Sequence, residues 1–140
     1  MNFLYTDLMY PVLFSILCST IIGVEREIKT KDAGLKTSIF ITIGSCVFAF
    51  IGSEVLDSGD RSRVIAQIIQ GIGFIGGGVI IFVGDKIRGI TSASIIWMLA
   101  GIGILCGMHR YKEALLLSIT IVILDNGIDR AKKFFSKEEK

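Results

Sequence analysis

Apolar stretches separated by short polar segments dominate the chain. There are five of them, at residues 8–24, 37–56, 64–83, 90–108 and 114–124. The third stretch has twenty residues without a charge, which at about 1.5 Å rise per residue covers the roughly 30 Å hydrocarbon core of a bilayer. The pattern predicts an all-α fold, a polytopic membrane helix bundle with about five transmembrane helices and short loops.

Composition and charge placement agree with this prediction. With 51% hydrophobic residues and a mean hydropathy of +0.67, the chain is too apolar for a soluble domain of its size. If the N-terminus is outside and all five stretches cross, the inner segments hold eleven Lys and Arg residues and the outer segments four. If the short fifth stretch does not cross, the counts become six and nine, against the positive-inside rule. We therefore expect the N-terminus outside and the C-terminus in the cytoplasm, with a transmembrane domain over 1–125 and a basic cytoplasmic tail over 126–140.

The third stretch is too polar at its start for a plain membrane anchor. At 100° per residue, Asp60, Arg63 and Gln67 fall on one stripe of a helix, with Gln70 beside it. Polar groups at this depth must be paired or must line water. Two interpretations stay open: hydrogen bonding between helices, or a polar pocket at the outer face that takes an ion or small ligand.

The same stretch is also rich in glycine. Its glycines are Gly71, Gly73, Gly76, Gly77 and Gly78. In a helix interior each glycine is less stable than alanine by roughly 1 kcal/mol, so packing must offset the combined cost of the five. Small residues also allow helices to approach closely in lipid. We therefore predict that this segment is the buried, central helix of the bundle. Gly101, Gly103 and Gly107 supply a second close-contact face in the fourth stretch.

The sequence argues against an enzyme, a cofactor or a metal site. Gly71, Gly73 and Gly76 spell a dinucleotide-binding fingerprint, but no strand precedes them and no acidic residue follows about twenty positions later. No nucleophile–base pair or metal-ligand cluster can be assembled, and nothing indicates a nucleic-acid partner. Glu54, Asp57 and Asp60 could bind a hard divalent cation. We favour instead an interfacial Glu54 and local pairing of Asp60 with Arg63.

The cysteines and the charges after the first stretch complete the picture. Cys18, Cys46 and Cys106 lie within apolar stretches without metal-site spacing, so we expect small core residues. Basic residues at the inner loop set orientation and meet anionic lipid head groups. The carboxylate of Glu25 does little for orientation, so we expect a fixed partner for it, such as Lys36 or Arg88 across the bundle.

Three separate stretches match one family pattern. The first is Gly23-x-Glu25-Arg26-Glu27 with Lys31-x-Ala33-Gly34-Leu35-Lys36-Thr37. The second is Asp60-x-x-Arg63-x-x-x-Gln67 followed by Gly71-Ile72-Gly73-Phe74-Ile75-Gly76-x-Gly78. The third is Arg88-Gly89-Ile90-Thr91-x-Ala93 with Trp97 and Gly101-Ile102-Gly103. Together, over about residues 7 to 125, they resemble the membrane domain of the MgtC/SapB family of bacterial inner-membrane proteins.

The resemblance implies a set of functional positions. The inner-face motif would be Glu25, Arg26 and Lys36, with Arg88 and Thr91 at the start of the fourth helix. Asp60, Arg63 and Gln67 would be the polar positions of the third helix. Longer family members carry a soluble C-terminal domain that we expect this chain to lack. Arg61 stands where a proline is common, and Lys36 replaces the usual arginine, which weakens bidentate recognition of a carboxylate or phosphate.

The resemblance also implies a function. We expect an inner-membrane protein linked to magnesium homeostasis and to stress or virulence adaptation, acting as a regulator that binds itself or another membrane protein. The alternative is a small oligomeric transporter or channel for a cation or small solute, with the Asp60 to Gln70 stripe along its path. Expected partners are membrane lipids and either a second copy or another membrane protein.

Overall fold

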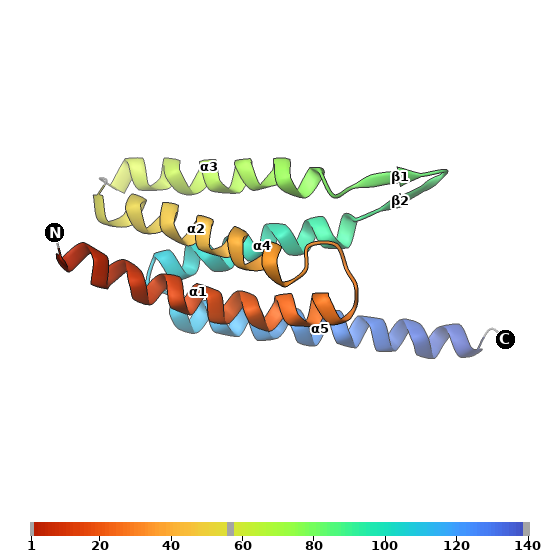
Figure 1. The fold of residues 1–140 in the computed structure, drawn as a ribbon. Helices are drawn as coiled ribbons and strands as arrows, with labels where there is room; N and C mark the ends of the chain where they lie inside the picture. Colours follow the sequence, from red (N-terminus) through yellow and green to blue (C-terminus); the bar gives the residue numbers. More distant parts are fainter. Residues whose placement is uncertain (1, 56–57, 139–140) are drawn as a thin grey trace.

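The structure is a bundle of helices with one short hairpin. A computed structural model describes residues 2–55 and 58–138 of the chain. The order of its elements is α1 Asn2–Ile28, α2 Leu35–Val55, α3 Ser58–Gly77, β1 Ile81–Val83, β2 Lys86–Arg88, α4 Ile90–Gly107 and α5 Tyr111–Glu138. Each of the five predicted apolar stretches lies mainly in one of the five helices, so the helical fold class is confirmed for the described residues (Figure 1).

Three of the helices are long and apolar enough to cross a membrane. Within the described residues these are Asp7–Ile28 of α1, Leu35–Glu54 of α2 and Ile90–Gly107 of α4. Neither α3 nor α5 is among them, because α3 ends early and both carry several charges. Helix α5 also continues without a break through residue 126, the predicted start of the tail.

The centre of the bundle is α4, which packs against all four other helices. Its buried positions include Ile96, Leu99, Ile102 and Cys106. In the described chain, the helices that pack substantially against α3 are α2 and α4, and α3 lies along one edge of the bundle (Figure 1). Between residues 60 and 77, only Ile72 and Gly76 are buried. The prediction that the third helix is the buried, central one is therefore wrong.

The interior of the bundle consists largely of small side chains. All three cysteines are buried and free, as predicted from their place in apolar stretches. Buried hydroxyl groups donate to backbone carbonyls one turn back, as in Ser15 Oγ to Val12 O at 2.8 Å and Ser118 Oγ to Ala114 O at 2.8 Å. These bonds satisfy the hydroxyl groups without a partner helix. Small, self-satisfied residues let the helices approach closely.

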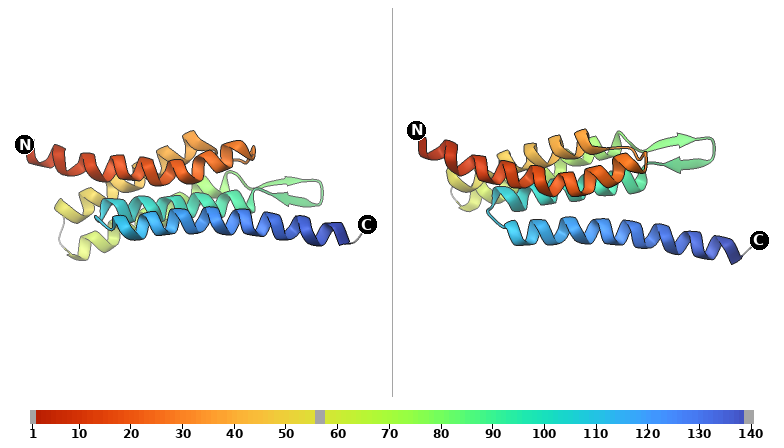
Figure 2. Two further views of the ribbon diagram at one scale, coloured as in Figure 1. Left: turned by 90° about the horizontal axis from the view of Figure 1, so that it is seen from below. Right: turned by 60° about the horizontal axis from the view of Figure 1, so that its bottom comes forward.

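A β-hairpin replaces the predicted end of the third helix. We expected helix to residue 83 and a six-residue loop, but α3 ends at Gly77 and β1 pairs with β2 antiparallel, Phe82 opposite Ile87. Gly84 takes the positive φ of 62° in the two-residue turn. Because the hairpin is exposed throughout, nothing packs its apolar side chains in this chain. It projects beyond one end of the bundle, as does the C-terminal part of α5 (Figure 1 and Figure 2), and we call this the hairpin end.

Candidate functional site

A groove of about 710 Å³ opens between α2 and α3. We call it the α2–α3 groove. On the α3 side it is lined by Asp60, Arg63, Gln67 and Gly71, the polar stripe read from the sequence. On the α2 side it is lined by residues 40, 41, 44, 45 and 48, within a candidate membrane span. The structure therefore places a polar stripe beside an apolar wall at the depth of a spanning helix.

Helix α3 is held at its two ends and stands away between them. Near the first end, a Cβ on Gly52 of α2 would lie 3.2 Å from Val64. Near the other, a Cβ on Gly76 would lie 3.5 Å from the carbonyl oxygen of Ala93 on α4. Between these points Gly44 and Gly71 face open space. The groove thus results from two close contacts with a gap between them.

Most of the α3 glycines do not pack against this chain. A Cβ added at Gly71, Gly73 or Gly77 would meet nothing within 4 Å, and one at Gly78 would meet only its own preceding turn. Gly76 alone of the predicted packing set touches another helix. The described chain therefore supplies a close neighbouring helix for Gly76, and the prediction that the five glycines serve helix packing stays a prediction for the others, since a glycine permits close approach without supplying the opposing helix.

The polar groups of α3 are exposed. Asp60 and Arg63 form a local ion pair at 3.7 Å, with the Arg63 side chain 83% exposed. Within the part of the chain that the structure describes, neither the Gln67 nor the Gln70 amide has a hydrogen-bond partner. Gln67 lines the groove and Gln70 lies outside its lining. The expected shelter of these amides by neighbouring helices is absent from the described chain.

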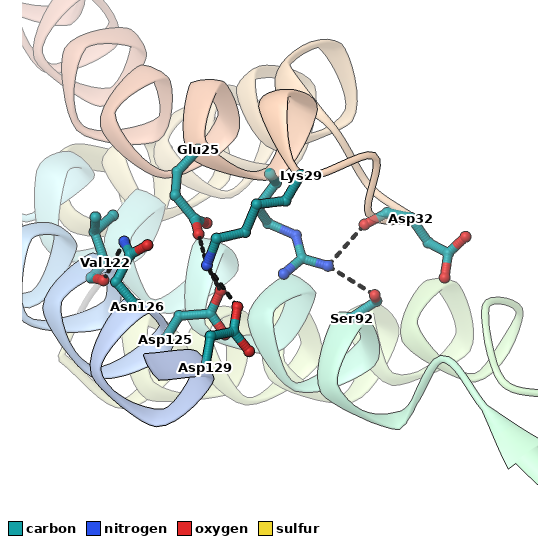
Figure 3. A network of polar contacts seen from close by, with 9 residues as sticks. Glu25, Lys29, Asp32, Ser92, Val122, Asp125, Asn126 and Asp129 are labelled. Atoms are coloured by element: carbon teal, nitrogen blue, oxygen red, sulfur yellow. Dashed lines mark hydrogen bonds and ion pairs between the residues drawn. The ribbon is translucent and has the colours of Figure 1, made fainter. Parts of the chain in front are cut away.

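A second polar region, at the hairpin end, joins α1 to α5. Lys29, directly after the end of α1, forms ion pairs with Glu25 in the last turn of α1, with Asp125 at 3.3 Å and with Asp129 at 2.7 Å. We call these four residues the Lys29 cluster. Figure 3 shows Asp125 and Asp129 reaching from α5 toward the ammonium group. The partner of Glu25 is therefore Lys29, and the predicted pairing with Lys36 or Arg88 is wrong.

Within the Lys29 cluster, contacts with the neighbouring charges shift the pKa values of Lys29 and Asp129 toward their charged forms. Partial burial of Lys29 lowers its pKa, but hydrogen bonds to Asp129, Glu25 and Asp125 outweigh this, so its pKa is raised overall. The hydrogen bond from Lys29 lowers the pKa of Asp129, with smaller contributions from Lys31 and Lys132. Helices α1 and α5 are thus joined by fixed charges at this end.

Beside the cluster lies a buried arginine. Arg26 is 1% exposed, and its Nη2 donates to Ser92 Oγ of α4 at 2.7 Å and to the backbone oxygen of Asp32 at 2.9 Å. Its Nε has no partner. Figure 3 draws both bonds. Glu27 accepts from the backbone N–H of Leu35 at 2.9 Å and so caps the start of α2.

The structure brings together only part of the inner-face motif. Glu25 and Arg26 take part in fixed interactions, whereas Lys36, Arg88 and Thr91 are exposed. Sequence reasoning missed Ser92, Asp125 and Asp129. One signal was available, since Asp125 and Asp129 are four residues apart at the end of an apolar run and share a helix face.

Carboxylates at the opposite end form no metal site among the described residues. No group of three His, Cys, Asp or Glu side chains there or elsewhere in the described chain could hold an ion. Glu54 lies 3.9 Å from His109 Nε2, and Asp57 falls outside the described residues. Arg61 donates to the backbone oxygen of Ser53 at 2.6 Å, which ties the start of α3 to α2.

Comparison with known proteins gives the family. The model of the MgtC family matches residues 12–134, which include the α3 stripe, Arg26 and the whole Lys29 cluster. The chain belongs to the MgtC family. This confirms the resemblance drawn from the three sequence motifs.

Named relatives of this MgtC-family chain come from two genera. Protein MgtC of Salmonella typhimurium is 39% identical over 121 residues, which cover 84% of this chain and 51% of the relative. Protein MgtC of Brucella abortus is 33% identical over 111 residues, which cover 79% of this chain and 47% of the relative. The chain thus spans about half the length of the curated relatives it matches. No solved structure matches it.

Proposed function

We propose that this MgtC-family chain is a multi-pass protein of the bacterial inner membrane, with the N-terminus outside and the C-terminus in the cytoplasm. Three candidate spans and the distribution of Lys and Arg support this placement. Helices α3 and α5 run beside the candidate spans, and in the proposal they cross with them. The Lys29 cluster and the hairpin then lie at the cytoplasmic side.

Within that membrane, the chain acts as a regulator that binds other membrane proteins, with a role in magnesium homeostasis and in adaptation to stress or to a host. Its family membership and the MgtC relatives support this role. The proposal assigns no catalytic step to the chain.

The observation that carries the proposal is the α2–α3 groove. Its rims carry exposed aromatic side chains, Phe40 and Phe48, and its floor is opened by Gly44 and Gly71. Gln67 presents an amide donor and acceptor without a partner in the described chain. An amide beside lipid is unfavourable until it is hydrogen-bonded. The occupant that fits is a transmembrane helix of another membrane protein, with small residues and one polar group facing Gln67.

Site-specific crosslinking tests this occupant. A photoreactive residue placed at Gly71 should crosslink to a membrane protein in cells, and one at Gly101, which also faces open space on α4, should not. The Gly71→Leu variant, whose side chain fills the groove, should no longer support growth of the cells at low magnesium concentration. The Gly101→Leu variant should still support growth. Equal crosslinking from both sites, or growth unaffected by Gly71→Leu, would contradict the proposal. Crosslinks only to a second copy would replace the partner protein by a homo-oligomer.

A transporter is the second candidate, because Asp60, Arg63 and Gln67 follow one another along the groove. The groove opens sideways, so a closed path would require two or more copies with their grooves facing. Flux of a cation or small anion into liposomes that is abolished by Gln67→Leu would favour this candidate. Flux equal to that of empty liposomes would remove it.

A further inference from the structure

A polar cavity at the hairpin end is separate from the α2–α3 groove. It measures about 560 Å³ and lies where α1, the start of α4 and α5 come together. Its lining includes Arg26, Lys31, Lys132 and the consecutive residues 89–92 at the start of α4. The cavity shares no lining residue with the α2–α3 groove, and it borders the Lys29 cluster through Asp125 and Asp129.

Arg26 is the first of two independent observations that point to a ligand. Its guanidinium group is 1% exposed, yet it has no carboxylate partner in the described chain. Only Nη2 is engaged, by Ser92 and the backbone of Asp32, while Nε is buried without an acceptor. A buried, unpaired charge is costly. An anion in the cavity that Arg26 lines would remove this cost.

The second observation is the uncapped start of α4. Its N-cap is Gly89, in the left-handed conformation, and no side chain caps the helix. The first N–H groups of a helix have no intrahelical acceptor, and they carry the positive end of its dipole. Because residues 89–92 line the same cavity as Arg26, both donor sets face one space. Backbone donors with an arginine are a common arrangement for binding phosphate.

The cavity lining carries as many carboxylates as cations. The carboxylates are those of Asp32, Asp125 and Asp129, and the last two form ion pairs with Lys29. The cations are Arg26, Lys31 and Lys132, and the two lysines are exposed at the edge without an ion-pair partner in the described chain. The anion is therefore held by the Arg26 guanidinium group and the free N–H groups of α4, with the two lysines at the edge, and not by a net positive charge.

We propose that this cavity binds a phosphate-type oxyanion, held by Arg26, Lys31, Lys132 and the first turn of α4. The cavity lies level with the ends of the three candidate spans, since α1 leaves its span at Ile28 and those of α2 and α4 begin at Leu35 and Ile90. The same chemistry is offered by an anionic lipid headgroup at the membrane surface and by free phosphate. The test separates the two sources.

The experiment uses the full chain in neutral detergent, with inorganic phosphate as the first probe and chloride keeping ionic strength constant. Phosphate should raise the thermal unfolding midpoint. In the second arm, phosphatidylglycerol should do so more than phosphatidylcholine, with lipid retention followed by native mass spectrometry. If phosphate raises the unfolding midpoint, the ligand is a free anion. If only phosphatidylglycerol raises it, the ligand is a lipid headgroup. No response in either arm would overturn the proposal.

Variants of exposed lysines keep the test independent of folding. Lys31→Ala with Lys132→Ala should weaken binding roughly thirtyfold, since each surface lysine contributes about 1 kcal/mol toward an anionic headgroup. The matched control, Lys86→Ala with Lys133→Ala, removes the same charge at exposed positions outside the cavity lining and should bind as the wild type does. Asp32→Asn should tighten binding about threefold by removing a repulsive carboxylate. Equal weakening by both double variants would show general charge attraction and would overturn the site.

Discussion

Helices α4 and α3 are both rich in glycine, yet the structure uses them in opposite ways. On α4, a Cβ at Gly103 would lie 2.7 Å from Ser45 Cβ, and one at Gly107 would lie 2.9 Å from Ala49 Cβ. On α3, Gly71, Gly73 and Gly77 face open space. The glycines of α4 thus allow close packing against α2, whereas these glycines of α3 leave a helix face without a packing partner in the described chain.

The difference lies in what stands opposite. Helix α2 presents Ser45, Cys46 and Ala49 to α4, so the two backbones can come into contact. Toward α3 the same helix lines the groove with Gly44, which faces open space, and with the largely exposed side chains of Phe40 and Phe48. A glycine-rich face thus indicates where close approach is possible, and the facing helix decides whether it occurs.

The largest expected effect is on the close contact between α4 and α2. Gly107→Ala should destabilise the protein by about 3 kcal/mol, because the new methyl group meets α2 backbone that cannot move aside. Gly71→Ala should be neutral or should stabilise by up to about 1 kcal/mol, since alanine is the better helix former. Unfolding in mixed micelles, followed by circular dichroism, measures both. Similar losses in the two variants would refute the contrast.

A smaller effect compares two arginines. Arg26→Ala should cost about 2–3 kcal/mol, because it leaves a cavity and deprives Ser92 and the Asp32 carbonyl of their donor. Arg63→Ala should change the unfolding free energy by less than about 0.5 kcal/mol, because its pair with Asp60 is exposed. The same unfolding assay, without added phosphate, compares them. If Arg63 proved as costly as Arg26, the α3 stripe would be packed in the folded protein.

The smallest effect depends on pH. Lys29→Met should cost roughly 1–2 kcal/mol at neutral pH, by leaving three carboxylates close together. The lowered pKa of Asp129 gives stability that is present above its unfolded value, near 3.9, and is lost as pH falls through the folded value. The raised pKa of Lys29 gives stability present below about 10.4 and lost as pH rises through its folded value.

The difference between wild type and Lys29→Met should therefore be largest between about pH 4 and pH 10 and should shrink in acid. Unfolding midpoints measured from about pH 2 to about pH 10 check this. Arg63→Met is the matched control and should give a small, nearly flat difference. A Lys29→Met difference that persists below pH 4 would mean that lost packing, and not charge, explains the variant.

The hairpin was missed although its signals are in the sequence. Gly76, Gly77 and Gly78 weaken the helix in succession, and Gly84-Asp85 is a two-residue turn that follows Val83 and precedes Lys86 and Ile87. Apolar content alone predicts helix up to residue 83. Short apolar runs fit both helix and strand, so the glycines and the turn should have decided.

The sequence by itself determined the five helices, their order, the burial of the cysteines and the family, because hydrophobic runs and motif spacing are local properties of the chain. Only the tertiary structure decided that α4 is central and α3 is peripheral. It also decided that Lys29 gathers its carboxylates from α1 and α5 and that Arg26 is buried without one. These outcomes depend on which side chains face each other across helices, and a pattern along one helix does not specify its neighbour.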